Sequence, residues 1–244
     1  MTTVLTAIAL MAASSPALGD ITEPMPLCAP DGAWCIAVDT LDGIDKLVVT
    51  AGPLEGQTLD IAMPDGIDTP EISVALWDQA IATPSGSLVG ITHEARALYS
   101  GGTASVTRLS LYAIDTESGI SGPLLIVPLT SDIMIRACFG EDDEQRRLGA
   151  CHDQYIFDAT LFALSGAASD AGLPDLGFRT QASAYPRTSL RDLDSSQHPP
   201  FDPADLTIAE IGRCSFKRVF SFDTVAGRYK PDSQLPNCSD FTTP

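Results

Sequence analysis

Residues 154–164 read Gln-Tyr-Ile-Phe-Asp-Ala-Thr-Leu-Phe-Ala-Leu, and this stretch decides the fold class. In an extended chain, one face would carry the apolar residues Tyr155, Phe157, Ala159 and Leu161. The other face would carry Asp158 and Thr160. Successive side chains of a strand point to opposite faces of the sheet, so a period of two is typical of a half-buried antiparallel strand. The pattern therefore predicts a strand.

Two glycine-containing turns extend this prediction to hairpins. Asp42-Gly43 separates two strand-like runs at 33–40 and 45–51, and a Gly-Gly pair at 101–102 separates two more. Asp-Gly and Gly-Gly favour two-residue hairpin loops because both positions tolerate a positive φ. The runs together predict a mainly β fold, either an antiparallel sandwich or a distorted barrel.

Other segments leave parts of the architecture open. A Pro-x-Gly before a strand occurs at 30–32 and 84–86, which leaves an irregular β-propeller-like arrangement as an alternative. Residues 72–80 fit either a helix or a strand. Residues 165–213 are rich in Ser, Asp, Gly and Pro, so we expect a long loop. Within that loop Asp-Pro predicts the start of one short helix over 203–211, because Asp caps helices and Pro suits their first position.

The beginning of the chain has the features of an export signal. The first 19 residues contain no charged side chain, 4–13 is an apolar run, and 17–19 supplies small residues suited to cleavage. We therefore expect a signal peptide at 1–19 and a single disulfide-stabilised domain at 20–244. No later segment has the length and apolarity of a membrane span. Arginine outnumbers lysine and asparagine is almost absent. This bias is typical of GC-rich bacterial genomes, so the expected location is periplasmic or secreted.

The cysteines support this location. Six cysteines fall into three neighbouring couples: Cys28 and Cys35, Cys138 and Cys151, and Cys214 and Cys238. Six cysteines allow 15 pairings, which the sequence alone does not distinguish. Oxidising surroundings favour paired thiols, and each couple brackets a local turn, so we expect sequential disulfides. The chain contains no C-x-x-C motif and its histidines are scattered, which argues against a zinc site. We assign no metal ligand and no cofactor.

The charge balance limits the class of partner. The chain has 32 Asp and Glu against 14 Lys and Arg, a formal net charge of -18. Nucleic acids and anionic membrane surfaces are bound by cations, so neither is expected as a partner. Near the C-terminus, however, cations cluster. The candidate binding residues in this predicted hairpin are Lys217, Arg218, Arg228, Tyr229 and Lys230.

This cationic hairpin predicts binding of an anionic ligand or of a carboxylate-bearing partner surface. The alternative is that the cations only pair with nearby acids such as Asp223 and Asp232. A strongly acidic protein also suits a basic protein partner. We therefore expect an exported, non-enzymatic binding or interaction protein of unknown ligand. A structural envelope component is a further alternative.

An enzymatic alternative rests on His152-Asp153, because a carboxylate can orient a histidine for acid–base chemistry. That alternative is a carboxylate-dependent hydrolase. The chain has no G-x-S-x-G motif and every cysteine has an expected partner, so we assign no catalytic residue. The four consecutive carboxylates at 141–144 fit either a calcium-binding turn or a solvated loop.

Overall fold

The computed structural model describes residues 25–65, 71–169, 172–189, 191 and 198–244. The expected signal peptide at 1–19 lies outside these residues. The smaller of two antiparallel sheets contains β1 (Leu27–Cys28), β2 (Cys35–Leu41), β3 (Ile44–Ala51) and β4 (Thr58–Asp60), in that order. Between β2 and β3, Asp42 and Gly43 have φ angles of 56° and 78°. The predicted two-residue hairpin is therefore confirmed.

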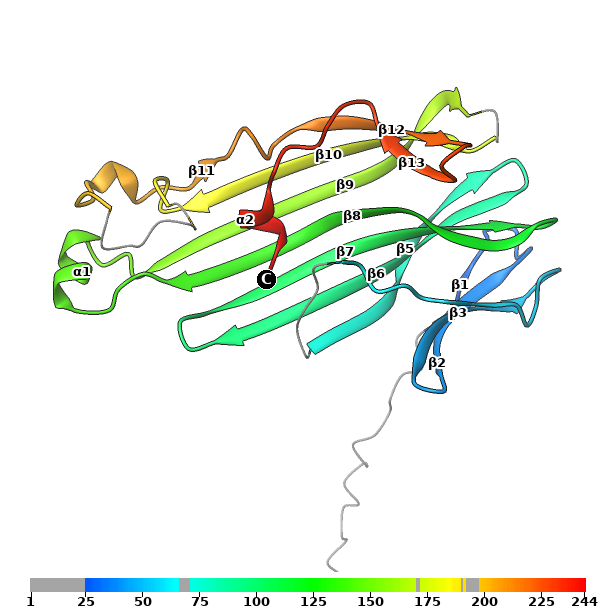
Figure 1. The fold of residues 1–244 in the computed structure, drawn as a ribbon, viewed down its shortest axis with the longest axis horizontal. Coiled ribbons are helices and arrows are strands. Elements are labelled where there is room, and N and C mark those ends of the chain that lie inside the picture. The colour runs from blue at the N-terminus through cyan, green and yellow to red at the C-terminus, as the bar shows by residue number, and fades with distance from the viewer. Residues whose placement is uncertain (1–24, 66–70, 170–171, 190, 192–197) are drawn as a thin grey trace, which may run out of the picture.

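The larger sheet has nine strands (Figure 1). They are β5 (Glu71–Thr83), β6 (Gly86–Tyr99), β7 (Gly102–Asp115), β8 (Gly119–Arg136), β9 (His152–Ala168), β10 (Pro174–Tyr185), β11 (Ala209–Glu210), β12 (Lys217–Asp223) and β13 (Arg228–Pro231). The order is β13-β12-β10-β9-β8-β7-β6-β5, and β11 pairs with β10. The mainly β prediction is confirmed, and the undecided residues 72–80 belong to β5.

The larger sheet separates into two halves at an irregularity in β8. Thr107 and Arg108 of β7 pair with Thr130 and Pro128, so Leu129 of β8 is an extra residue. Such a bulge bends a strand and increases its twist. From Thr130 onward β8 pairs with β9, whereas the first part of β8 pairs only with β7. The two halves consequently diverge (Figure 1).

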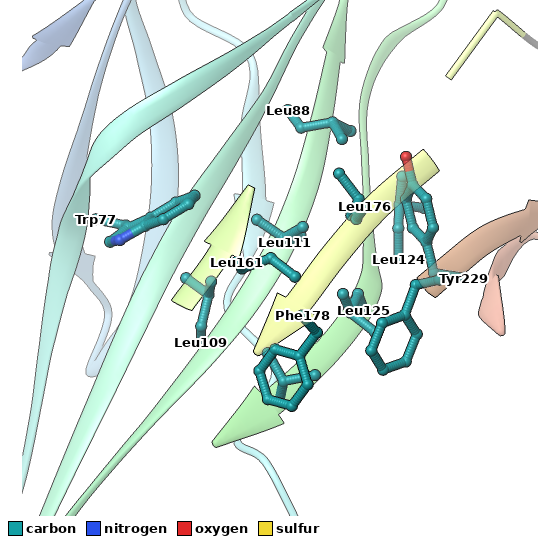
Figure 2. Packing of buried hydrophobic residues seen from close by; sticks show 12 residues of the cluster. Trp77, Leu88, Leu109, Leu111, Leu124, Leu125, Leu161, Leu176, Phe178 and Tyr229 are labelled. Atoms are coloured by element: carbon teal, nitrogen blue, oxygen red, sulfur yellow. The ribbon is translucent and has the colours of Figure 1, made fainter. Parts of the chain in front are cut away.

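The space between the halves is filled by the main apolar core (Figure 2). Leu88 and Leu109 come from one half, and Leu176, Phe178 and Tyr229 come from the other. Burial of each large apolar side chain contributes about 1.5–3 kcal/mol. The result is consistent with a sandwich, and the described strands form neither a closed barrel nor a set of radial blades.

A third layer covers the other face of β5–β8. Trp34, Ile36 and Leu47 of the smaller-sheet region pack there against Val89 and Tyr112 of β6 and β7. All five side chains are at most 3% exposed. The smaller sheet therefore depends on the larger one for its core.

His93 on β6 lies buried on the face of the larger sheet that carries Val89 and Tyr112. Its side chain is 0% exposed and neither ring nitrogen has a hydrogen-bond partner among the described residues. Burial lowers the pKa of His93 below its ordinary value of 6.5, although the Asp45 carboxylate acts in the opposite direction. The buried hydroxyl of Ser110 on β7 also lacks a partner within the described part of the chain.

This histidine predicts a loss of stability in mild acid. The lowered pKa means that below pH 6.5 the unfolded chain binds a proton that folded His93 does not. The free energy of unfolding should therefore fall as the pH drops through 6.5, by up to about 1.4 kcal/mol per pH unit, until the folded state also protonates. Urea denaturation at about pH 7.5, 6.5 and 5.5 measures this slope. We expect His93→Leu to flatten it, and an unchanged slope in that variant would assign the effect to other groups.

Two sequence expectations in the region 165–213 need correction. The long-loop expectation is wrong for Pro174–Tyr185, which forms β10 between β9 and β12. Asp202 caps a 3₁₀ turn at Pro203–Asp205 as expected, but the helix does not extend to 211. Instead β11 pairs with Ser183 and Ala184 of β10. Pairing with β10 gives the backbone N–H and C=O groups of β11 hydrogen-bond partners. A short isolated helix would leave several of these groups without partners.

The three predicted disulfides are confirmed: Cys28–Cys35, Cys138–Cys151 and Cys214–Cys238. They fit an oxidising location outside the cytosol. The second encloses helix α1 (Glu141–Arg146), and the third ties the segment before β12 to helix α2 (Ser239–Thr242). Among the described residues, no helix is long and apolar enough to cross a membrane.

Candidate functional site: the outer face of β9, β10 and β12

The predicted cationic hairpin does not form a single binding surface. Tyr229 is only 4% exposed, packs in the main core, and donates its hydroxyl hydrogen to the Pro174 carbonyl oxygen at 2.9 Å. Burial raises the pKa of Tyr229 far above its ordinary value. Its neighbour Arg228 is exposed on the opposite face of β13. Tyr229 is therefore a core residue, because side chains alternate between the faces of a strand.

Two of the other cations, Arg218 and Lys230, form ion pairs with nearby carboxylates. The Lys230 ammonium forms an ion pair with Asp223, and the Arg218 guanidinium lies 3.9 Å from the Asp232 carboxylate. Hydrogen bonds from Lys230 and from nearby backbone N–H groups lower the pKa of Asp223. For these two cations, the pairing alternative is confirmed.

Lys217, in contrast, faces a second cation. The antiparallel register of β10 and β12 places Arg179 directly opposite Lys217. Both side chains are exposed. Neither side chain has a hydrogen bond or an ion pair with any other described residue. Like charges that face each other across a strand pair repel, typically by a few tenths of a kcal/mol to about 1 kcal/mol. An anion placed between them would remove this repulsion.

Arg179 is absent from the sequence-based candidates because its segment is assigned to a loop. The missed signal is the alternation at 176–184, Leu-Gly-Phe-Arg-Thr-Gln-Ala-Ser-Ala, in which apolar residues recur at every second position apart from Thr180. In β10 these residues face the core, while Gly177, Arg179 and Gln181 lie on the outer face. A period-two interpretation of this stretch predicts Arg179 as an exposed strand residue.

The two cations border a polar groove of about 720 Å³ on this outer face. Its polar lining includes Asp158, Thr160, Gln181, Glu210 and Ser215. Asp158 pairs with Gln181, which follows Arg179 on the same face of β10, and so Asp158 lies diagonal to Arg179. The groove thus offers hydrogen-bonding groups and carboxylates beside the cation pair.

The groove exists because the chain between β11 and β12 leaves the regular ladder. The Thr180 hydroxyl donates to the Cys214 carbonyl oxygen at 2.7 Å, and the Ala182 N–H donates to the Ser215 hydroxyl at 3.0 Å. They accompany two backbone hydrogen bonds outside the regular ladder, from the Thr180 N–H to the Phe216 carbonyl oxygen at 2.9 Å and from the Ile211 N–H to the Ala182 carbonyl oxygen at 2.8 Å. Cys214 is fully buried and bridged to Cys238. The disulfide therefore anchors the irregular segment that lines one side of the groove.

A smaller, largely apolar groove of about 330 Å³ begins on the other side of the same cations. Its apolar lining is Phe162, Leu164, Gly177, Phe178 and Val219, and the two cations and the Arg218–Asp232 ion pair complete it. Phe162 is 44% exposed, and its ring lies over Gly177, where a Cβ atom would approach the ring carbons to 2.5 Å. Glycine at 177 therefore leaves room for the exposed ring.

The side chains of His152 and Asp153 point to opposite faces of β9, so the two do not act as a pair. His152 is exposed, whereas Asp153 is 8% exposed on the opposite face of β9. The Asp153 carboxylate forms an ion pair with Arg147 and accepts a hydrogen bond from the Ser189 hydroxyl at 2.8 Å. The Arg147 guanidinium also lies over the Phe201 ring at 4.6 Å. These contacts join three loop segments around one buried charge pair.

The acidic run Glu141–Glu144 forms the first turn of α1. Negative side chains at this end interact favourably with the helix dipole. The described residues contain no group of three or more His, Cys, Asp and Glu side chains that would hold a metal ion.

The outer face of β9, β10 and β12 is thus the surface on which exposed cations, hydrogen-bonding groups and apolar side chains adjoin. Its chemistry suits reversible binding of an anion with a polar and an apolar part. We call this surface, centred on Arg179 and Lys217, the outer-face site. Comparisons of the chain with protein-family models, with curated proteins and with solved structures found no match.

Proposed function

We propose that this protein is an exported binding protein that receives an anionic ligand at the outer-face site. The observation that carries the proposal is the cation pair: Arg179 and Lys217 face each other without a partner among the described residues, in a chain with a net charge of -18. With 32 carboxylates in the chain, two neighbouring cations without an acidic partner in its described part favour an external anion.

The scaffold supports this function physically. Arg179 and Lys217 extend from the paired strands β10 and β12 near one edge of the larger sheet, and the disulfide at Cys214 anchors the adjacent segment. Because the sheet is rigid, the backbone that carries both cations is already ordered before binding, and less conformational entropy is lost when the ligand binds. The site is exposed, so each contact is weak, and an anion that bridges both cations gains two charge-assisted hydrogen bonds.

A titration with succinate tests the proposal. We expect its two carboxylates to shift the backbone amide NMR signals of β9, β10 and β12 in the wild-type protein. The double variant Arg179→Ser/Lys217→Ser should bind succinate at least about tenfold more weakly, because charged hydrogen bonds contribute roughly 1.5–3 kcal/mol each.

Arg228→Ser is the matched control, since Arg228 is an exposed cation that lies opposite Asp223, at the other end of β12 from Lys217 and about 20 Å along the strand. It should leave the succinate response within about twofold of wild type, because charges beyond a Debye length are screened. An equal loss of binding in Arg228→Ser would indicate attraction by overall charge alone. The absence of any shift in the wild type would refute the proposal.

A further inference from the structure

We infer that the ligand of the outer-face site is the C-terminal end of another polypeptide, with an apolar last residue and a basic residue two positions before it. The inference rests on the proposed function and names the class of its ligand. It comes from the order in which chemical groups follow one another across the site.

The two grooves adjoin at the cation pair. Arg179 and Lys217 line both the polar groove of about 720 Å³ and the apolar groove of about 330 Å³. Along β9 and β10 the paired rows are Phe162 with Gly177, then Thr160 with Arg179, and then Asp158 with Gln181. A ligand lying along these strands therefore meets apolar, cationic and acidic surface in that order.

The terminal carboxylate of a peptide would bind at the cationic surface, between the apolar and the acidic surfaces. Placed between Arg179 and Lys217, it accepts hydrogen bonds from both side chains, as a bridging anion requires. The side chain of the last residue then lies against the exposed Phe162 ring, which covers Gly177, and against Val219. An apolar side chain buries part of the exposed Phe162 ring there, and removal of apolar surface from water favours binding.

The distance from the cation pair to Asp158 determines where in the peptide a basic residue would lie. Asp158 is the diagonal neighbour of Arg179, and such neighbours lie about 7–8 Å apart. An extended peptide advances about 3.3 Å per residue, so two residues cover nearly this distance. A lysine two positions before the C-terminus therefore reaches Asp158. Glu210 lies in the same groove and adds to the attraction.

A simple alkyl carboxylate fits the site less completely. It would fill the apolar groove and satisfy the cations, but it would leave the polar groove without a ligand. Thr160 and Gln181 offer hydrogen-bonding groups there. Amide groups of a peptide backbone use such partners, whereas a hydrocarbon chain does not.

The test compares three probes by NMR titration of the full chain: the peptide acetyl-Gly-Lys-Gly-Leu with a free carboxylate, the same peptide with a C-terminal amide, and octanoate. We expect the free peptide to bind at least about tenfold more tightly than the amide, because the amide lacks the charge that both cations recognise. Octanoate should bind more weakly than the free peptide.

Two variants locate the contacts. Gly177→Ala places a Cβ where the Phe162 ring now lies, so it should displace the ring and weaken peptide binding several-fold, while succinate binding stays within about twofold. Asp158→Asn should weaken binding of the lysine peptide but not of the same peptide with serine in place of lysine. Both variants should retain wild-type amide spectra away from the site.

The outcomes separate this inference from the proposed function. If succinate binds and the free and amidated peptides bind equally, the C-terminal assignment is wrong while the anion site stands. If octanoate binds as tightly as the free peptide, the ligand is an alkyl carboxylate and the peptide assignment is wrong. If neither succinate nor the peptide binds, both proposals fail.

Discussion

Asp153→Ala is expected to lower the free energy of unfolding by about 3–5 kcal/mol, several times the effect of a typical surface substitution. The Arg147 and Asp153 side chains are 3% and 11% exposed, and they form an ion pair. Removing the carboxylate leaves a buried guanidinium without its counter-charge and the Ser189 hydroxyl without its acceptor. Urea denaturation followed by circular dichroism measures the loss.

Two controls separate the ion pair from general damage. Arg147→Met/Asp153→Leu removes both charges together, and a buried pair replaced by apolar side chains is often neutral in stability. We therefore expect the double variant to recover most of the loss. Asp158→Ala removes an exposed carboxylate from the same strand and should change stability by no more than about 0.5 kcal/mol. A loss below about 1 kcal/mol in Asp153→Ala would contradict a structural role for this carboxylate.

The double variant Cys214→Ser/Cys238→Ser is expected to lose about 3.5 kcal/mol, because the bridge closes a loop with a sequence separation of 24. It should also weaken succinate binding, since the bridge anchors the segment that forms one wall of the polar groove. Cys214 supplies the carbonyl oxygen that the Thr180 hydroxyl contacts. Denaturation and the succinate titration provide the two measurements.

The matched control is Cys28→Ser/Cys35→Ser. This bridge spans a sequence separation of only 7 and joins β1 to β2 in the smaller sheet. The loop-entropy relation gives about 2.5 kcal/mol for its loss, and the outer-face site should be unaffected. Equal losses of succinate binding in both double variants would show that the Cys214 bridge has no specific role at the site.

Local patterns in the sequence predicted much of the fold. The alternation of Tyr155, Phe157 and Leu161 predicted β9, and these side chains are at most 2% exposed. Asp42-Gly43 predicted its hairpin because a tight turn with positive φ angles is a property of those two residues. The same local reasoning paired the cysteines, since each couple is close in sequence.

The candidate site was predicted only in part, because it depends on strand register. Lys217 stood among the predicted binding residues, but Arg179 did not. Ser, Asp, Gly and Pro around β10 suggested a loop, yet β9 on one side and β12 on the other supply hydrogen-bond partners that make this segment a strand. Pairing with distant strands outweighed local composition, as expected for β structure.

The sequence by itself determined the mainly β class, the Asp42-Gly43 turn and the acidic net charge, all of which follow from neighbouring residues or from composition. It favoured the sequential disulfides, and the structure fixed which of the 15 possible pairings is present. Only the tertiary structure decided that Arg179 faces Lys217, that Tyr229 enters the core, and that Asp153 is buried beside Arg147. A shift of one residue in strand register moves every side chain to the other face of the sheet. Register is set by packing between distant strands, which no local pattern contains.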